Sequence, residues 1–479
     1  MSHVEEIFIS PHPLDRFNGL ISPEKFTEVR RQMAEIARRL EGRVWWNINS
    51  TARGGGVAEM LQSLLSYPLG SGIDTRWLVI KGSPEFFQVC KHLHHAMHGE
   101  VSDDGPVGDA ERLIYEQVLD KSARDLVGLI RPGDVVFLHD PQTAGLASTL
   151  ARAGAVVIWQ SHIGTDVPNE ATESAWTFLM PYLSSIDAVI FSRCDYIPSS
   201  FDPNMTAIIP PSIDPFSAKN QDLDDAAIRA ILEHAGFVVD APSDGQPLYW
   251  AADGSSRRVE RRADIIRNGP APSWETPLVV QVSRWDPLKD PIGVMNGFVE
   301  PDDLAAEAVL VLTGPDVAAV TDDPEGIETF DDVFKEWRQL PHEDRGRIHL
   351  VSLSMADVEE NAAIVNALQR HASVVVQKSL KEGFGLTVAE AMWKGRPVVA
   401  SRVGGIQDQI EDGVHGLLID DPSDQEAFNA ALKTVIADPE LATRLGANAR
   451  ERVRDEFLAD RQLIKYGELL ARLDVGTST

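Results

Sequence analysis

Hydrophobic positions in this chain follow two alternating spacings. Near the start, Ser22 and Pro23 are typical of a helix cap and first turn, and apolar residues then recur at helical spacing at positions 26, 29, 33, 36 and 40. Short apolar runs bounded by glycine, proline or polar residues come next, mostly separated by helix-like stretches; they predict strands at 44–48, 77–80, 135–138, 156–159 and 188–191. This alternation indicates a parallel sheet with helices on both faces.

A second series of the same kind follows a break. Residues 219–275 are charged, contain several prolines and show no clear period, so we interpret them as a linker or insertion. Beyond them the pattern predicts strands at 278–282, 308–312, 348–351, 374–377, 398–400 and 417–419, and closing helices at 426–436 and 457–473. The predicted order is an N-terminal Rossmann-like domain (1–218), the linker (219–275), a C-terminal Rossmann-like domain (276–455) and a C-terminal helix (456–479) that returns to the N-terminal domain.

The fold class that these series predict is α/β, with two doubly wound domains. Such sheets bind ligands outside the carboxyl ends of their strands, so we expect the domains to face each other across a cleft. A length of 479 residues suits two or three domains.

The composition of the chain limits the classes of binding partner that we expect. The net charge of −29 and the pI of about 4.8 disfavour nucleic acid and anionic membrane surfaces, so an anionic ligand needs a local patch of cations and N–H groups. Cys90 and Cys194 form neither a disulfide framework nor a metal cluster. No secretory signal is evident, and no apolar run reaches the roughly 18 residues of a membrane span. We expect a cytoplasmic protein.

The most informative chemistry lies in residues 378–419. Glu382 and Glu390 flank a Gly-Phe-Gly turn at 383–385, which we predict to open a helix. Backbone N–H groups at such a start suit phosphate oxygens. Glu390 falls among apolar helix residues, where a carboxylate needs a partner, and the hydrogen bonds it accepts suit the vicinal hydroxyls of a ribose. Glu382 suits sugar hydroxyls, so the segment predicts a sugar-nucleotide site.

A pair of cations follows the predicted strand at 278–282. Arg284 and Lys289 lie five residues apart across a proline-containing turn. A guanidinium fork and a compact ammonium make a clamp for a diphosphate. Ordinary salt bridges to Asp286 and Asp290 fit the spacing equally well.

Two further groups follow strands of the first series. Gly55 and Gly56, with Gly54 before them, stand at a strand-to-helix turn where a ligand can approach the backbone, although a flexible loop explains the triplet as well.

His139-Asp140 and His162 each come directly after a predicted strand, where sites form, although a single histidine is more often structural. The sequence has no H-E-x-x-H, Walker A, CxxC or G-x-S-x-G motif, and we expect no metal site.

R-x4-K after a strand and E-x7-E within E-G-F-G-L-T-V-A-E-A together resemble the retaining glycosyltransferases of the GT-B fold, family four. Further segments are similar to the trehalose glycosyltransferring synthases: N-S-T-A-R-G-G-G-V-A-E-M-L from Asn49, G-I-D-T-R-W-L-V-I-K-G from Gly72, F-F-Q-V-C-K-H-L-H-H from Phe86, H-D-P-Q from His139, P-P-S-I-D-P from Pro210 and V-S-R-W-D-P-L-K-D-P from Val282. The resemblance is specific because several separated motifs occur in order from about Arg43 onward.

That family transfers glucose from a nucleoside diphosphate glucose, such as ADP-glucose or UDP-glucose, to free glucose, giving α,α-trehalose. The resemblance implies front-face attack, in which the departing phosphate takes the acceptor's proton and no protein nucleophile is needed. It implies catalytic roles for Arg284, Lys289, His162 and Glu382; donor contacts from Gly55, Gly56, Arg284, Lys289, Glu382, Gly383, Phe384, Gly385, Leu386 and Glu390; and acceptor contacts from Asp140 and His162.

The chain departs from the family pattern around the acceptor and the donor sugar, and Thr143 replaces the second proline of the H-D-P-Q-P pattern. Gln160-Ser161 stands where an Arg-Cys pair often precedes the histidine, and Gly164 stands where an aspartate is common. A retaining trehalose phosphorylase, a glucosyltransferase with another small acceptor such as a glycerol derivative, and a non-catalytic sugar or nucleotide sensor are the alternatives. We expect no tightly bound cofactor, and any Mg²⁺ is expected to be associated with the diphosphate. The resemblance to the family implies a homodimer.

Overall fold

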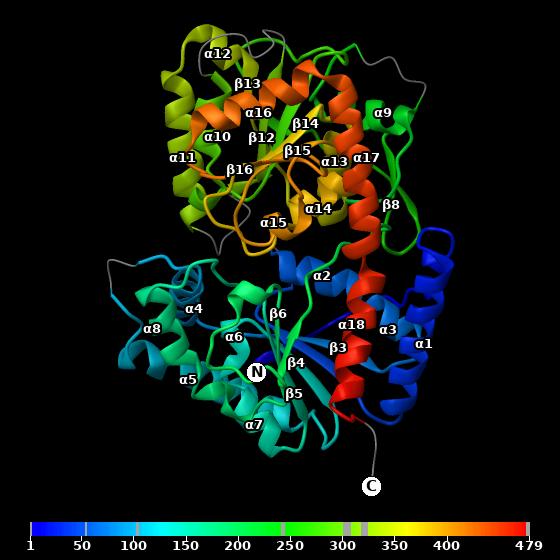
Figure 1. The fold of residues 1–479 in the computed structure, drawn as a ribbon, viewed down its shortest axis with the longest axis vertical. Coiled ribbons are helices and arrows are strands. Elements are labelled where there is room, and N and C mark those ends of the chain that lie inside the picture. The colour runs from blue at the N-terminus through cyan, green and yellow to red at the C-terminus, as the bar shows by residue number, and fades with distance from the viewer. Residues whose placement is uncertain are drawn as a thin grey trace. The chain divides into compact units, whose positions relative to one another are not determined.

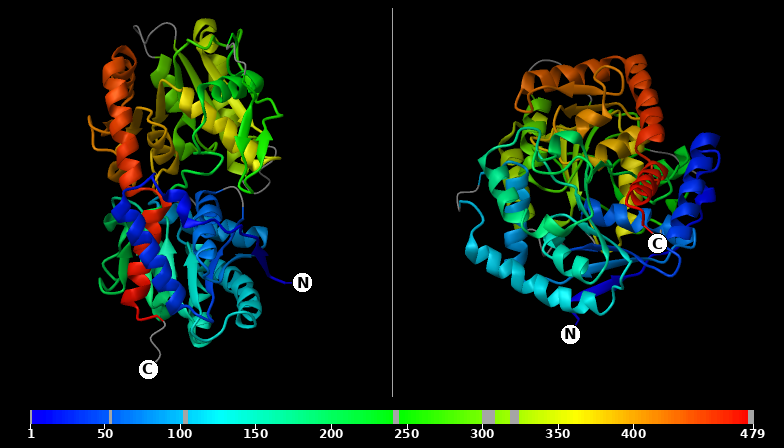
Figure 2. Two further views of the ribbon diagram at one scale, coloured as in Figure 1. Left: turned by 90° about the vertical axis from the view of Figure 1, so that its right-hand side faces the viewer. Right: turned by 60° about the horizontal axis from the view of Figure 1, so that its bottom comes forward.

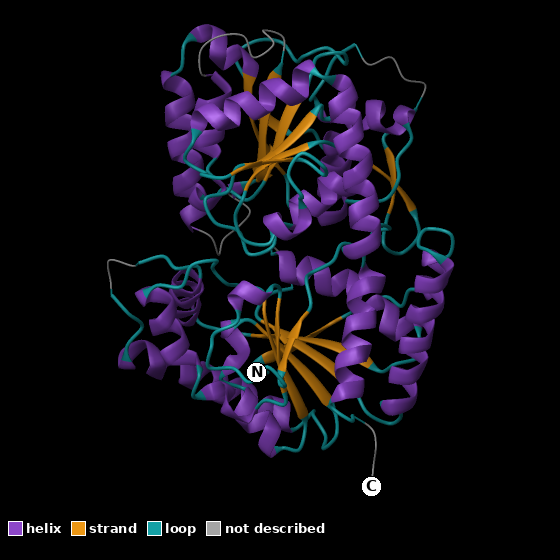
Figure 3. Cartoon of the chain, viewed as in Figure 1, coloured by secondary structure: helices purple, strands orange, loops and turns teal. Residues whose placement is uncertain are grey.

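The computed structural model describes residues 2–52, 55–101, 105–240, 245–299, 308–317 and 324–475. The chain forms two compact units, each with one large sheet between layers of helices (Figures 1 and 3). The first unit comprises Met1–Ser212 and Phe457–Thr479, and the second comprises Ile213–Glu456.

The first unit contains a seven-stranded sheet in the order β1-β3-β2-β4-β5-β6-β7, in which only β1 is antiparallel to its neighbour. Its strands are β1 (Val4–Ile7), β2 (Trp45–Asn49), β3 (Thr75–Ile80), β4 (Val135–His139), β5 (Val156–Ser161), β6 (Ala188–Phe191) and β7 (Thr206–Ile208). Its helices are η1 (Leu14–Phe17), α1 (Pro23–Arg39), α2 (Gly56–Leu64), α3 (Ser66–Gly70), α4 (Pro84–Met97), α5 (Asp109–Val127), α6 (Pro141–Ala144), α7 (Ala147–Arg152), α8 (Glu170–Leu179), η2 (Tyr182–Ser185), η3 (Cys194–Tyr196) and α18 (Ala459–Arg472).

The helix α18 belongs to the core of this first unit, and it packs beside α1 (Figure 2). The ring of Tyr466 lies 5.1 Å from that of Phe137, and its hydroxyl donates to Oε1 of Gln160 at 2.8 Å. Nε2 of Gln462 donates to the same hydroxyl at 2.8 Å, and Ser212 Oγ donates to Oε1 of Gln462 at 2.7 Å. These buried polar groups form one chain of hydrogen bonds, which favours a single register of the helix.

The second unit repeats the architecture: its large sheet has the order β10-β13-β12-β11-β14-β15-β16, in which only β10 is antiparallel to its neighbour, and β8 and β9 form a separate antiparallel pair. Its strands are β8 (Leu248–Trp250), β9 (Ser256–Arg258), β10 (Asp264–Ile266), β11 (Leu278–Val282), β12 (Val309–Pro315), β13 (Ile348–Leu353), β14 (Val374–Gln377), β15 (Val398–Ser401) and β16 (Leu417–Ile419). Its helices are α9 (Asp225–Ala235), η4 (Pro287–Lys289), α10 (Pro291–Val299), α11 (Pro324–Gln339), α12 (His342–Arg347), α13 (Val358–His371), α14 (Leu386–Trp393), α15 (Ile406–Gln409), α16 (Gln425–Ala437) and α17 (Pro439–Glu456).

The segment 219–275, which we interpreted as a linker, is instead folded into the second unit. It supplies α9, which packs against α13, and β10, which extends the large sheet. Several of its charges are paired within that unit: Arg257 Nη1 lies 2.9 Å from Oε2 of Glu359, and Arg261 pairs with Glu360. Hydropathy cannot distinguish a paired charge from a solvated one, so this folded segment looks like a linker in the sequence.

The central strands of both sheets are buried along their length, for example Val135–His139 and Val374–Gln377. This burial explains their unbroken Val, Ile and Leu runs. In each sheet the parallel strands end at one edge, so the loops that follow them are brought together there. Of the helices in the described part of the chain, none combines the length and hydropathy that crossing a bilayer requires.

Candidate functional site

The loop after β11 carries the two predicted clamp cations. The side chain of Arg284 is half-exposed, and its Nη2 lies 2.9 Å from Oδ2 of Asp286. Oδ1 of Asp286 accepts the N–H of Leu288 at 2.9 Å, so this carboxylate shapes the turn. The salt bridge that we considered as an alternative to the clamp is therefore present for Arg284.

Asp290 fixes the end of that loop and hence the position of Lys289. Its backbone is left-handed, with φ of 48°, and its Oδ1 accepts the N–H of Gly293 at 3.0 Å, at the start of α10. The fully buried ammonium of Lys378 pairs with its other carboxylate oxygen. Gln281 Nε2 donates to the carbonyl of Lys289 at 2.8 Å. The backbone around Lys289 is thus held on both sides.

The loops after β11 and β14 are joined because these strands are neighbours in the sheet. The N–H of Leu380 donates to the carbonyl of Leu288 at 2.8 Å. Nζ of Lys289 lies 2.8 Å from Oε2 of Glu382, which also accepts from Ser379 Oγ at 3.1 Å. The structure therefore brings the R-x4-K and E-x7-E motifs into one cluster of opposite charges.

The turn that opens α14 is closely packed. Gly385 has a φ of 86°, which favours glycine, and precedes Leu386, the first helical residue. Gly405 approaches so closely that a Cβ there would lie 2.7 Å from Cα of Phe384. Nε2 of Gln409 donates to the carbonyl of Phe384 at 2.6 Å. The turn is held by these contacts, and the first N–H groups of an α-helix such as α14 lack intrahelical acceptors and carry partial positive charge.

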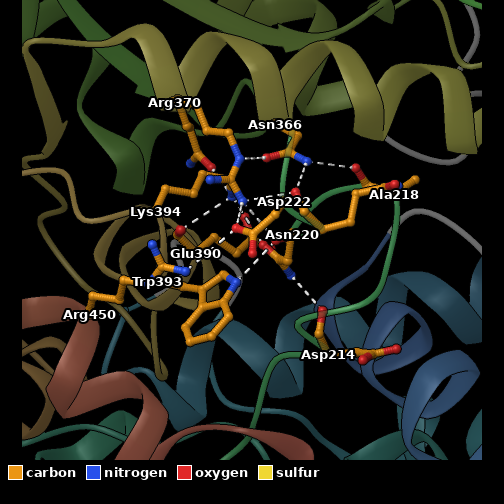
Figure 4. Close-up of polar contacts among 12 residues, drawn as sticks. Asp214, Ala218, Asn220, Asp222, Asn366, Arg370, Glu390, Trp393, Lys394 and Arg450 are labelled. Atoms are coloured by element: carbon orange, nitrogen blue, oxygen red, sulfur yellow. Dashed lines mark hydrogen bonds and ion pairs between the residues drawn. The ribbon is translucent and has the colours of Figure 1, made fainter. Parts of the chain in front are cut away.

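Glu390 lies inside α14, as predicted, and is only 2% exposed. Its Oε1 is 3.3 Å from Nζ of Lys219. Figure 4 shows Glu390 beside a set of polar residues at the ends of α13 and α14. A buried carboxylate paired with a cation stays available as an acceptor of further hydrogen bonds.

The first unit carries the second group of predicted residues at the ends of β4 and β5, which are neighbours. Asp140 has a strained φ of 62°, and its Oδ1 accepts the backbone N–H of His162 at 2.7 Å. Burial raises the pKa of the Asp140 carboxyl to about 7, against the effect of that hydrogen bond, which lowers it. The structure thus places Asp140 and His162 in direct contact.

The imidazole of His162 belongs to a short chain of polar groups. Its Nε2 lies 3.1 Å from Nδ1 of His139, and Nε2 of His139 lies 3.1 Å from Oδ1 of Asn47. Burial lowers the pKa of His162 to about 4. Burial, and secondarily the neighbouring His162, lowers the pKa of His139 well below its ordinary value. The lowered pKa values favour the neutral form of both rings, so one ring donates an N–H to the other.

Gly55 and Gly56 lie at the start of α2, after β2, which is the other neighbour of β4. A Cβ at Gly55 would meet no atom within 4 Å, so this turn leaves room above the backbone. Gly54 lies outside the described residues. In the described part of the chain, no group of three or more His, Cys, Asp or Glu side chains is placed to hold a metal ion.

Comparison with known proteins identifies the family. The profile described as "Trehalose synthase, N-terminal domain" matches residues 47–198, and that described as "Glycosyl transferases group 1" matches 357–452. A trehalose synthase of Pyrococcus horikoshii is 33% identical over 475 residues, covering 99% of each chain. One from Rubrobacter xylanophilus is 35% identical over 448 residues, covering 93% of this chain and 94% of that one. The chain belongs to the trehalose synthase family of glycosyltransferases.

Solved structures agree on the fold of this trehalose synthase family member. An α,α-trehalose-phosphate synthase (UDP-forming) from Burkholderia vietnamiensis is similar with a TM-score of 0.64 and 15% identity, covering 91% of this chain and 98% of that one. The prediction of a GT-B fold with two doubly wound α/β units is confirmed. The resemblance drawn from the motifs is confirmed with it.

The positions at which this trehalose synthase family member departs from the expected pattern have structural reasons. A Cβ at Gly164 would lie 2.1 Å from Cγ of Tyr196, so no side chain fits there. Asp166, two residues on, pairs with the buried Arg193. Gln160 accepts the hydroxyl of Tyr466 on α18. These residues serve the packing of the first unit.

Sequence reasoning missed several polar residues that position the predicted ones. Lys378 follows a buried strand directly, a signal that could have identified it. Asn47 lies inside β2 and has no such signal. Lys219 lies in the charged segment that we interpreted as a linker, and from the sequence it cannot be distinguished from the solvated charges around it.

Proposed function

We propose that this chain is a retaining glucosyltransferase that moves glucose from a nucleoside diphosphate glucose, ADP-glucose or UDP-glucose, to free glucose, forming α,α-trehalose. The observation that carries the proposal is the cluster in the second unit where Lys289 meets Glu382 beside the start of α14, with Glu390 buried in that helix. Membership of the trehalose synthase family supports the choice of product.

Each part of a nucleotide sugar has a chemically matched group in that cluster. We assign the diphosphate to Arg284, Lys289 and the first N–H groups of α14, whose positive ends favour phosphate oxygens. The ribose diol suits Glu390, and the hydroxyls of the transferred glucose suit Glu382. Gly55 and Gly56, at the start of α2 in the first unit, are also assigned a contact with the diphosphate. The proposal includes no resident cofactor and places any Mg²⁺ on the diphosphate.

The proposed reaction proceeds on one face of the transferred sugar. The bond between the anomeric carbon and the diphosphate oxygen breaks, and the 1-hydroxyl oxygen of the acceptor forms a bond to the same face of that carbon. The acceptor's proton passes to the departing phosphate oxygen. Arg284 and Lys289 stabilise the negative charge that develops there, so positioning and electrostatics supply the catalysis.

The acceptor is assigned to residues of the first unit. Asp140 in its ionised form accepts hydrogen bonds from glucose hydroxyls, and its strained backbone is typical of a functional position. His162, held neutral and hydrogen-bonded to His139, is assigned a contact with the donor sugar and a place beside the acceptor. A neutral imidazole binds a hydroxyl without adding charge to the site.

Turnover of three nucleotide sugars with and without glucose tests this proposal. We expect release of nucleoside diphosphate from ADP-glucose or UDP-glucose, more than from GDP-glucose, that depends on free glucose and is matched by trehalose. Trehalose formed from maltose without any nucleotide sugar would contradict the proposal that a nucleoside diphosphate glucose is the donor. Glucose 1-phosphate formed from trehalose and phosphate, with no synthesis from either nucleotide sugar, would identify a trehalose phosphorylase instead.

A further inference from the structure

The segment 214–222, at the start of the second unit, is a compact loop that supports itself. The N–H of Asn220 donates to the carbonyl of Ser217 at 2.9 Å, and its side-chain amide donates to the carbonyl of Asp214 at 3.2 Å. Oδ1 of Asp214 accepts the N–H of Phe216 at 3.0 Å. Asn220 is only 3% exposed, so the loop is buried at its centre.

The end of α13 holds this loop from outside. Nδ2 of Asn366 donates to the carbonyl of Ala218 at 3.1 Å (Figure 4). It also donates to the carbonyl of Gln221 at 2.9 Å. Nη2 of Arg370 donates to the carbonyl of Gln221 at 2.8 Å and pairs with Asp222 at 3.1 Å. Arg370 is at the last turn of α13, where a cation also favours the helix dipole.

The end of α14 holds the same loop. Nε1 of Trp393 donates to the carbonyl of Asn220 at 3.0 Å, and Nζ of the buried Lys394 donates to Oδ1 of Asn220 at 3.0 Å (Figure 4). Lys394 also donates to Oε1 of Gln369 at 2.8 Å. Direct hydrogen bonds therefore connect the helix that carries Glu390 to the loop that carries Lys219.

Lys219 extends from this fixed loop to the centre of α14. Its Nζ lies 3.3 Å from Oε1 of Glu390, and the two side chains are 17% and 3% exposed. A carboxylate offers about four lone-pair sites, so it can accept hydrogen bonds from more than one donor. A buried carboxylate that receives an uncharged diol also needs a counter-charge that stays in place.

We propose that Lys219 is a positioning residue for the ribose of the nucleotide, which acts by holding and neutralising Glu390. This inference rests on the proposed function, because it assumes that Glu390 receives the ribose diol. Lys219 contacts the carboxylate and not the nucleotide, so its loss weakens the two ribose hydrogen bonds together. Interactions with the base and the diphosphate stay as they were.

Calorimetric titration of the full chain with UDP and ADP, and with the 2′,3′-dideoxy form of each, tests the assignment. Of UDP and ADP, the nucleotide that wild type binds more tightly is the one to compare. Lys219→Met, which removes the ammonium, raises the Kd of that nucleotide by about tenfold, as expected for loss of a hydrogen bond to a charged group. The Kd of the corresponding dideoxynucleotide, which has no diol, changes less than twofold. Lys219→Arg restores most of the affinity for the natural nucleotide.

A purely structural ion pair would give a different result. In that case Lys219→Met would lower the melting temperature and weaken both forms of the nucleotide equally, and this result would overturn the inference while leaving the proposed function intact. A wild-type chain that binds neither UDP nor ADP would overturn both. Lys335→Met, which breaks the exposed pair with Asp332 on α11, is the matched control and leaves all four affinities unchanged.

Discussion

The ammonium of Lys289 lies 2.8 Å from Oε2 of Glu382, although 93 positions separate the two residues in the sequence. Both side chains are mostly buried, so without a ligand each neutralises the other. A diphosphate and a sugar offer replacements for both partners: oxygens for the ammonium and hydroxyls for the carboxylate. The pair would keep a cation ready at the proposed donor site of a strongly acidic protein.

That pairing predicts energetic coupling. Lys289→Met and Glu382→Gln each lower kcat/KM for the nucleotide sugar, and the double variant loses less than the sum of the two free-energy changes, by about 0.5–3 kcal/mol, because the first change already breaks the pair. Steady-state kinetics on the four proteins measures this difference. Additive losses would show that the two residues act independently. The exposed pair Lys335 and Asp332 serves as the control cycle, with no coupling in kcat/KM.

Arg284 is predicted to act in the chemical step and not in folding. Its side chain is half-exposed, so Arg284→Ala changes the melting temperature little. We expect kcat to fall on the order of 100-fold to 1,000-fold, as when a group that stabilises developing charge is removed. Arg258→Ala is the matched control, since Arg258 is as exposed and lies near Glu260. Equal activity of the Arg284 and Arg258 variants would show that Arg284 does not bind the diphosphate as proposed.

Asp140 gives a prediction for stability against pH. Burial raises its pKa in the folded chain to about 7 from an ordinary 3.8, so the folded state binds more protons than the unfolded chain between these values. The contribution of wild-type Asp140 to stability therefore falls as pH rises through this window, and Asp140→Asn does not share the loss. Relative to wild type, the variant gains at most roughly 4 kcal/mol from pH 4 to pH 7, at 1.36 kcal/mol per pKa unit.

Denaturant unfolding at a series of pH values measures that gain. All other groups titrate in both proteins, so the difference between them isolates Asp140. The exposed Asp120 on α5 provides the control, because Asp120→Asn should follow wild type at every pH. A difference between Asp140→Asn and wild type that stays constant from pH 4 to pH 8 would rule out a buried carboxyl with a raised pKa.

The turn before α14 is predicted to depend on the close approach of Gly405. A Cβ at that position would lie 2.7 Å from Cα and 3.0 Å from the carbonyl oxygen of Phe384, so Gly405→Ala must displace the turn. A displacement near 1 Å costs on the order of 100-fold in turnover. Gly346→Ala in α12, where the nearest atom to a Cβ is 3.4 Å away, is expected to keep full activity. Wild-type kinetics in the Gly405 variant would show that the turn does not position the donor.

The sequence alone predicts the buried part of the fold well, because a strand covered on both faces reads as an unbroken apolar run. The predicted strands at 188–191, 278–282, 374–377 and 417–419 match β6, β11, β14 and β16 at both ends. The edge strands β1, β7 and β10 were missed, since they are short and partly exposed. Helix α17 was missed because few of its side chains are buried, among them Leu445, Ala449 and Val453.

The candidate site divides in the same way. Residues that closely follow buried strands, such as Arg284 and Asp140, could be selected as candidates from position and chemical type. Their contacts could not, because the order in which strands pair is a property of the sheet and not of the local sequence. Lys219 was hidden for another reason: its charge is paired with a residue 171 positions away, and hydropathy cannot distinguish a paired charge from a solvated one.

The transfer itself is tested most directly by following one carbon atom. UDP-glucose or ADP-glucose labelled with ¹³C at the anomeric carbon is incubated with the protein and unlabelled glucose, and the products are identified by ¹³C NMR. The account predicts α,α-trehalose with the label in one of its two rings and the α configuration retained at the labelled carbon. Label that stays in the donor, appears only as free glucose or enters a β linkage would contradict the proposed function.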